Sequence, residues 1–405
     1  MNPVYNINLL SNIAILKKAK QWYANQKIST EQMGKVISMY PVNYYQPNLF
    51  VKIGLFLFTW FLAGAALGIY SLFSAIILSS INDITPFGIF SSLLFSGLAF
   101  FALEKLVKWR NWFSNGIDDA LLYIGLISLA VLLGFCFSDI DNEENMFLLF
   151  CVFYLPMLFF AMLRYLDRVV AALLTVCFYC MAFMLTMKLG SVAKYIMPFV
   201  FMALSLAIYF YVKKINANEK HFHLRKCMTV IKIIALLVFY ISGNYFVIRE
   251  SSVAFFEMEI VPGTDIPLAF LFYVFTAAVP LVYLYFALKK KDKHLLLVSL
   301  ILIAAAALTF KYYFSLGHPE ISLTIGGLIM IGVAYFSIRY LKSDRKGITF
   351  KDDPDEDNFL KSNAEALVIA QSFSAPAVQQ SGVEMGGGTF GGGGSGNKFY
   401  LNNKR

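Results

Sequence analysis

The chain is short of charged residues for its length. Only 15% of its 405 residues are charged, whereas an ordinary soluble domain carries roughly a quarter. Hydrophobic residues make up 59% and the mean hydropathy is +0.65, so the composition excludes a soluble globular protein and indicates a membrane protein. The net charge of +9 does not predict a nucleic-acid partner, because the basic residues are scattered among short loops and do not gather on one soluble face.

The sequence also lacks a cleavable signal peptide. The first apolar run starts near Leu49, far beyond the first roughly 15 to 30 residues in which such a peptide lies. We therefore expect the first transmembrane helix to act as the insertion signal.

Metal and redox motifs are equally scarce. Cys177 and Cys180 form a CxxC, but it lies inside an apolar run and not beside a βαβ unit. We therefore interpret the two cysteines as small packing side chains and not as a redox motif. His221, His223 and Cys227 come near metal-ligand spacing in a basic loop with no evident fourth ligand. We predict no metal, no cofactor and no catalytic residue, and a non-enzyme is the favoured interpretation. An enzyme acting on lipid-linked substrates would need a convergent acid, base or metal set that we cannot assemble.

Long apolar runs fill most of the chain. A helix needs about 20 apolar residues to cross the hydrocarbon core of a bilayer. Runs of this length predict an all-α fold, a polytopic bundle of about ten transmembrane helices. They lie at approximately 50–72, 87–106, 118–138, 146–165, 168–189, 193–213, 229–248, 267–288, 294–315 and 320–341.

Basic residues are divided unequally among the loops between these runs. Lys and Arg collect in cytoplasmic loops. With a cytoplasmic N-terminus, successive loops lie alternately outside and inside the cell. The outside then receives only Lys188, Lys194, Arg249 and Lys311, and loop 138–146 has no basic residue at all. We therefore predict a multi-pass protein of the inner (plasma) membrane with both termini in the cytoplasm. Acidic and basic residues at inner helix ends, such as Asp118 and Arg164, are expected to be interfacial anchors or short ion pairs.

Residues 1–48 are predicted to form a short cytoplasmic helical segment. "ISTEQM" has the pattern of a helix start, with Ser29 as the N-cap and Gln32 completing a capping box. Residues 49–341 form the expected transmembrane domain. Residues 342–405, acidic at first and then Gly-rich, cannot bury enough apolar surface to fold alone, and they predict a disordered cytoplasmic tail.

The stretch "AKQWYANQKISTEQMGKVISMY", followed by a membrane span, resembles the N-terminal segment of a broad family of predicted bacterial integral membrane proteins of unknown function. The resemblance covers about one tenth of the chain and departs at Lys27, where the family usually has a small apolar residue. It implies a bacterial polytopic protein and supplies no activity. The matching positions are Trp22, Ile28, Glu31, Gln32, Ile37 and Tyr40.

Polar residues inside the seventh run give the sharpest functional hypothesis. Ser242 and Asn244 need partners in a medium without water, and Lys311 in the ninth run falls at a similar depth. Arg249 and Glu250 are expected to form an interfacial pair that closes the helix. The candidate site in the outer half of the membrane comprises Ser242, Asn244, Lys311, Arg249, Glu250, His318 and Glu320. The alternative is that Lys311 extends to the surface and Asn244 merely bonds a neighbouring helix.

Two functions remain open. Ten spans suit a small-solute transporter made of two inverted halves, although residues 50–189 and 193–341 show no sequence similarity. The other is a non-catalytic scaffold or sensor that contacts a protein partner through its N-terminal segment or tail. Gly64 and Gly68 have GxxxG spacing, which allows either oligomerisation or close packing within the chain.

Overall fold

The computed structural model shows an all-α protein. It describes residues 3–42, 47–78, 84–110, 113–216, 219–256, 265–290 and 292–313, and single positions at 324, 327, 328, 331, 332, 335 and 339. The predicted tail at 342–405 and most of the expected tenth run at 320–341 lie outside the described residues.

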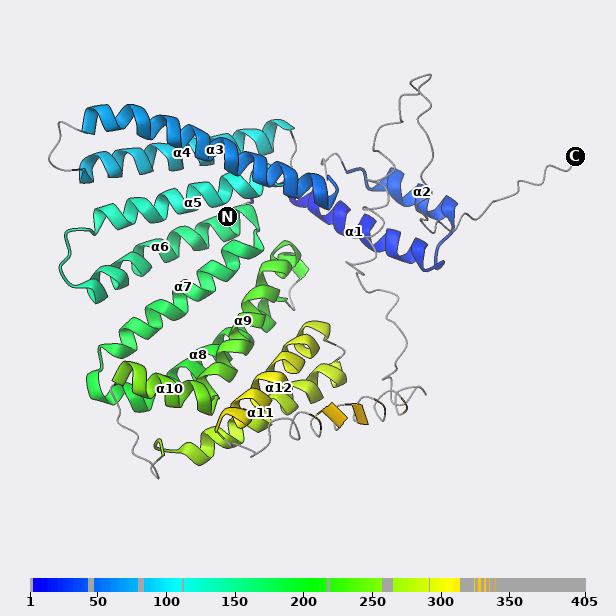
Figure 1. Cartoon of the computed structure of the whole chain (residues 1–405). Coiled ribbons are helices and arrows are strands. Elements are labelled where there is room, and N and C mark those ends of the chain that lie inside the picture. The colour runs from blue at the N-terminus through cyan, green and yellow to red at the C-terminus, as the bar shows by residue number, and fades with distance from the viewer. Residues whose placement is uncertain are drawn as a thin grey trace, which may run out of the picture. The chain divides into compact units, whose positions relative to one another are not determined.

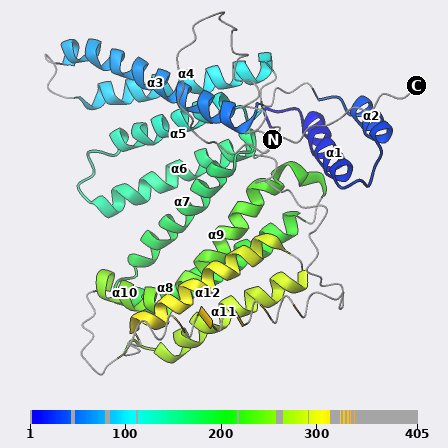
Figure 2. The ribbon, with the colours of Figure 1, turned by 45° about the vertical axis from the view of Figure 1, so that its right-hand side comes forward.

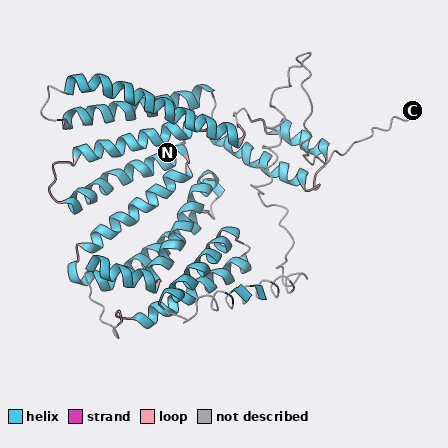
Figure 3. Ribbon diagram, viewed as in Figure 1, coloured by secondary structure: helices cyan, strands magenta, loops and turns pink. Residues whose placement is uncertain are grey.

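Twelve α-helices and two short 3₁₀ turns make up the continuous described segments, which contain no strand (Figures 1 and 3). The helices are α1 (Ile7–Ala24), α2 (Thr30–Met39), α3 (Leu49–Leu78), α4 (Thr85–Arg110), α5 (Ile117–Cys136), α6 (Glu143–Tyr165), α7 (Arg168–Met187), α8 (Ala193–Asn216), α9 (Arg225–Gly243), α10 (Tyr245–Phe256), α11 (Ala269–Lys290) and α12 (Lys293–Tyr313).

Eight described helices are long and apolar enough to cross a membrane, and a ninth span exists if the bent pair α9 and α10 counts as one. Helices α3 to α8, α11 and α12 coincide with eight of the ten expected runs. The protein is therefore a multi-pass integral membrane protein whose partner is the lipid bilayer. The prediction of one continuous helix for the seventh run was wrong, because the structure breaks this run at Asn244.

Successive long helices run in opposite directions, so that the bundle has an end that carries α1 and an end that carries α10 (Figures 1 and 2). Helix α9 joins its two halves, because it packs against α7 and α8 on one side and against α11 and α12 on the other. One hydrophobic core lies among α4 to α7 and the start of α9, and a second lies among α9, α11 and α12. The second core and a smaller third one, formed by Tyr245, Ile248, Ile266 and Phe272, hold the elements of the candidate site.

Helix α3 lies at the edge of the bundle, and none of its membrane-spanning window is buried. A Cβ atom added at Gly64 or Gly68 would meet nothing within 4 Å. In the described part of the chain these glycines therefore serve no close helix packing. Oligomerisation through them stays a prediction.

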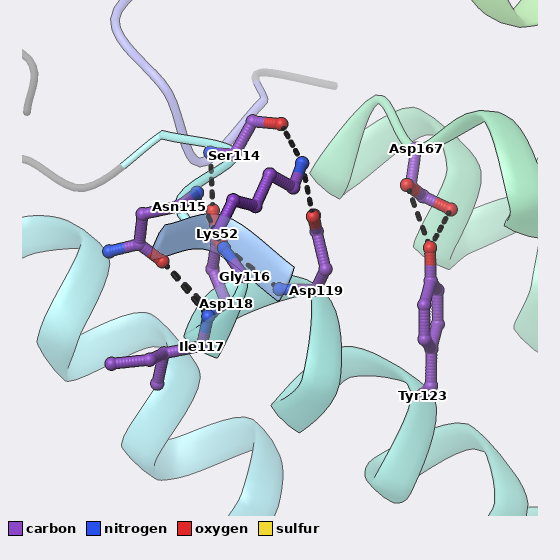
Figure 4. Close-up of polar contacts among 9 residues, drawn as sticks. All are labelled: Lys52, Ser114, Asn115, Gly116, Ile117, Asp118, Asp119, Tyr123 and Asp167. Atoms are coloured by element: carbon purple, nitrogen blue, oxygen red, sulfur yellow. Dashed lines mark hydrogen bonds and ion pairs between the residues drawn. The ribbon is translucent and has the colours of Figure 1, made fainter. Parts of the chain in front are cut away.

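Asp118 organises the loop that leads into α5, at the α1 end of the bundle (Figure 4). Its carboxylate accepts hydrogen bonds from the backbone N–H groups of Ser114 (2.6 Å), Asn115 (3.0 Å) and Gly116 (3.2 Å). Gly116 has φ +101°, and a Cβ there would collide with the carbonyl oxygen of Lys52. Only glycine fits this turn, and the Asp118 carboxylate satisfies backbone N–H donors of the loop that are buried or partly buried.

Two other carboxylates at this end of the bundle, those of Asp119 and Asp167, have partners on neighbouring helices. Lys52 Nζ lies 2.7 Å from Asp119 and ties α3 to α5, as Figure 4 shows. Tyr123 donates a hydrogen bond to Asp167, the N-cap residue of α7. Burial raises the pKa of Asp167, and the nearby charge of Asp119 acts in the same direction. The contacts confirm that these side chains hold helix ends together.

The N-terminal segment docks on this end of the bundle. The N–H of Val4 donates to the carbonyl oxygen of Arg164 at 3.0 Å, and Leu10 is buried in the first core. The predicted capping box at the start of α2 is confirmed: the N–H of Gln32 donates to Ser29 Oγ at 3.2 Å, and the N–H of Ser29 donates to Gln32 Oε1 at 2.8 Å. The segment is thus built from the local signals in its sequence.

Asp292 joins α9 to α12. Its Oδ1 atom accepts from the N–H of Leu295 at 3.2 Å, and its Oδ2 atom lies 2.6 Å from Lys232 Nζ. Burial by itself would raise the pKa of Asp292, but the hydrogen bond and charge of Lys232 outweigh burial and hold the pKa below its usual value. The ionised carboxylate therefore contributes to stability.

Replacing Asp292 by Asn should cost about 1–3 kcal/mol of unfolding free energy at neutral pH, because a partly buried lysine loses its counter-ion. The folded pKa lies below the unfolded value of about 3.9, so the contribution is present above that pH and is lost as the pH falls through the folded pKa. Unfolding in detergent, followed at several pH values, should show the difference between wild type and D292N shrinking below about pH 4. D141N, in an exposed loop, serves as the control. A pH-independent difference would contradict this account.

Candidate functional site

The seventh span is broken at its far end. Helix α9 ends at Gly243, α10 begins at Tyr245, and the two helices are bent by 72°. Asn244 between them is extended, with φ −79° and ψ 126°. Its Oδ1 atom accepts from the N–H of Val247 at 3.3 Å, which is the bond that an N-cap residue makes. A helix-weakening glycine followed by a capping residue explains the break.

Asn244 is also the polar link between α9, α10 and α12. Its side chain is 3% exposed, and its Nδ2 group donates to Tyr240 Oη at 2.9 Å and to Thr309 Oγ1 at 3.2 Å. The break also frees the N–H of Tyr245, which donates to Thr276 Oγ1 of α11 at 3.0 Å. Two hydroxyls from neighbouring helices therefore satisfy buried polar groups at the break.

A cluster of tyrosines and charges covers this junction on the α10 side. Tyr245 Oη donates to Asp265 at 2.6 Å and accepts from Arg249 at 2.9 Å. The guanidinium of Arg249 lies 4.9 Å from the ring centre of Tyr313, and Tyr313 Oη donates to Glu250 at 2.6 Å. Arg249 and Glu250 thus contact tyrosines, and the expectation that they pair with each other to close the helix was wrong. Each charge is hydrogen-bonded to a tyrosine hydroxyl.

A cavity of about 840 Å³ opens beside the break, between α9, α10 and α12. We call it the α9–α12 groove. Its polar lining residues are Tyr240, Asn244, Thr309, Lys311 and Tyr312, and its apolar ones are Leu237, Ile241, Phe246, Val247, Ile301, Leu302, Ala305 and Leu308. Lys311 is exposed to the groove region and makes no hydrogen bond or ion pair with any described residue. An apolar wall with one cation suits a ligand that has an apolar body and an anionic group.

The structure brings some predicted site residues together and separates others. Asn244 and Lys311 line the same groove. Ser242 Oγ donates to the carbonyl oxygen of Phe239 at 3.0 Å, within its own helix, and it does not line the groove. Arg249 and Glu250 belong to the neighbouring tyrosine cluster. His318 and Glu320 lie outside the described residues.

Sequence reasoning missed three contributors to the junction. Tyr240, Thr276 and Thr309 supply the hydroxyl partners of Asn244 and Tyr245. Thr309 lies two residues before Lys311, at a membrane depth similar to that of Asn244, and this was a usable signal. Thr276 gave no such signal, because a threonine inside a span usually bonds its own helix.

The weaker motifs have structural roles. Cys177 Sγ lies 4.0 Å from the carbonyl oxygen of Cys151, and both cysteines are free thiols. Cys227 is buried and donates to the carbonyl oxygen of Asp167 at 3.4 Å. Within the described ranges, no group of three or more potential ligands is placed to hold a metal ion.

No protein-family model matches the chain, and comparisons with curated proteins and with solved structures find no significant match either.

Proposed function

We propose that the protein is a transporter-like bundle that takes up an anionic amphiphile in the α9–α12 groove. The observation that carries the proposal is the juxtaposition of the broken span at Asn244 with Lys311, across one mainly apolar cavity of about 840 Å³. Small-molecule pockets typically have volumes of about 300–1,000 Å³.

The composition of the groove selects the ligand class. An alkyl or aromatic body would lie against residues such as Ile301 and Leu308, and it would leave water for an apolar surface. Its anionic group would be attracted to Lys311, because a cation within a membrane span is costly without a partner. A small sugar or inorganic ion would leave most of this lining unused. The sequence predicted a small solute as the ligand, and the lining of the groove favours an amphiphile.

The broken helix favours movement of the ligand over storage. Transporters place discontinuous helices at their substrate sites, and the break is the point at which one half-helix can rotate against the other. Here Asn244 contacts α12 through Thr309, and Tyr245 contacts α11 through Thr276. A change at the groove would therefore reach both neighbouring helices.

We further propose that the α1 end faces the cytoplasm, because the excess of Lys and Arg lies at that end of the expected topology. The groove then lies in the outer half of the bilayer. A bacterial inner membrane is the location implied by the resemblance of the N-terminal segment.

Lys311→Met should slow ligand movement strongly. We suggest reconstituting the protein into phosphatidylcholine vesicles with a trace of NBD-labelled phosphatidylglycerol, and following its arrival in the outer leaflet by dithionite bleaching. Transbilayer movement should be at least about tenfold slower in K311M, which corresponds to an activation free energy raised by about 1.4 kcal/mol or more. K311R retains the charge and should retain movement.

NBD-labelled phosphatidylcholine provides the matched control for charge. We expect little protein-dependent movement of this zwitterionic lipid, because it offers Lys311 no net negative charge. Equal movement of both lipids, or unchanged movement in K311M, would contradict the proposal.

A scaffold or sensor is the second candidate, and the docked N-terminal segment favours it. Helix α1 is held by the bundle, whereas α2 leaves Ile37 and Met39 exposed at 50% and 71%. A partner protein could cover these side chains. We rank this function second because exposed single apolar residues are common on surfaces, and the α9–α12 groove would have no role in it.

A further inference from the structure

A second cavity lies at the opposite end of the bundle, between α1 and the membrane domain. It measures about 420 Å³. Helix α1 supplies Leu10, Ile13, Ala14, Lys17, Lys18 and Gln21, and the domain supplies Phe113, Leu166, Phe222, His223 and Lys226. We call it the α1 cavity. Its walls belong to two parts of the fold that the first core joins through Leu10.

The α1 cavity is lined by lysines and by apolar side chains, and both of its walls supply residues of each kind. Lys17 and Lys18 from α1 and Lys226 from α9 line it, and its described lining residues include no carboxylate. Lys18 Nζ also lies 5.5 Å from the ring centre of Trp22. Several lysines around one hollow concentrate positive potential, and lysine is a common phosphate ligand that acts as a point charge.

We propose that the α1 cavity binds a phosphorylated ligand. Its phosphate would be held between Lys18 and Lys226, and its less polar part would lie against Phe113 and Phe222. A ligand in this position would bridge α1 to the start of α9, the helix that ends at the Asn244 break. The ligand is either a soluble phosphate compound or the headgroup of a phospholipid. The inference is independent of the proposed transport activity, because the two cavities share no residue.

The test uses the full chain in nanodiscs, with Trp22 as the reporter. The substitutions W60F, W109F and W112F remove the other three tryptophans and leave Trp22 beside Lys18. One arm titrates ATP and, separately, inorganic pyrophosphate into phosphatidylcholine nanodiscs. The other arm raises the fraction of phosphatidic acid in the disc. We expect a saturable change of Trp22 fluorescence in one of the two arms, and the arm that responds identifies the source of the phosphate.

The double variant K18Q/K226Q should weaken this binding at least about tenfold. K20Q on the same helix is the matched control, because Lys20 is exposed and does not line the cavity. Lys18, Lys20 and Lys226 are exposed, so we expect the variants to fold. An unchanged midpoint of thermal unfolding would verify this. K311M should bind as the reporter protein does, which separates this site from the α9–α12 groove. No saturable change in either arm, or equal binding by K18Q/K226Q and K20Q, would overturn the proposal.

Discussion

Replacing Asp118 by alanine is expected to destabilise the protein by about 3–5 kcal/mol, the largest effect that we predict. Asp118 is 3% exposed, and its carboxylate accepts hydrogen bonds from the N–H groups of Ser114, Asn115 and Gly116. Alanine would remove these acceptors together. Each buried donor left without an acceptor costs about 1–3 kcal/mol, although relaxation of the loop recovers part of the sum.

Unfolding of the purified protein by SDS in mixed micelles would measure this loss. Asp118→Asn keeps one acceptor oxygen and should fall between wild type and D118A. Asp119→Asn disrupts a more exposed ion pair with Lys52, and it should cost only about 1 kcal/mol. A D118A protein within about 1 kcal/mol of wild type would show that the loop does not depend on its carboxylate.

Asn244→Ala should cost about 2–4 kcal/mol and should impair ligand movement at the same time. It removes the N-cap bond to Val247 and the bonds to Tyr240 and Thr309. Tyr240 and Thr309 would remain buried with fewer partners, and the angle between α9 and α10 would lose its main constraint. The same SDS titration and the NBD-phosphatidylglycerol assay measure both effects.

Ser242→Ala is the control for this substitution. Ser242 lies two residues earlier, but among the described residues its hydroxyl bonds only the carbonyl oxygen of Phe239 in its own helix. We expect a change within about 0.5 kcal/mol and normal movement of the lipid. If N244A behaved like S242A, Asn244 would not be the residue that holds the break.

The spans were predictable because a run of about 20 apolar residues is a local property of the sequence. The capping box at Ser29 and Gln32 was predictable for the same reason, since both partners lie within one turn. The break at Asn244 had a local signal in the Gly–Asn pair. Its bend, however, depends on Thr276 and Thr309, which lie 31 residues after Tyr245 and 65 residues after Asn244.

The error over Arg249 and Glu250 has a similar origin. Adjacent opposite charges look like a pair in a sequence, but residues i and i+1 of a helix point in different directions. In the folded chain Arg249 reaches Tyr245, one turn away, and Glu250 reaches Tyr313 on α12. The shared groove of Asn244 and Lys311 was a hypothesis from membrane depth alone, and the packing of α9 against α12 was needed to establish it.

The most direct test of the central claim is photolabelling of the α9–α12 groove. A phosphatidylglycerol with a diazirine on its acyl chain would be irradiated with the protein in phosphatidylcholine nanodiscs, and the adducts would be mapped by mass spectrometry. We predict adducts concentrated on groove residues such as Val247, Ile301 and Leu308, and their loss in K311M. Labelling spread evenly over the lipid-facing helices, or an identical pattern from a diazirine phosphatidylcholine, would contradict an anionic-amphiphile site.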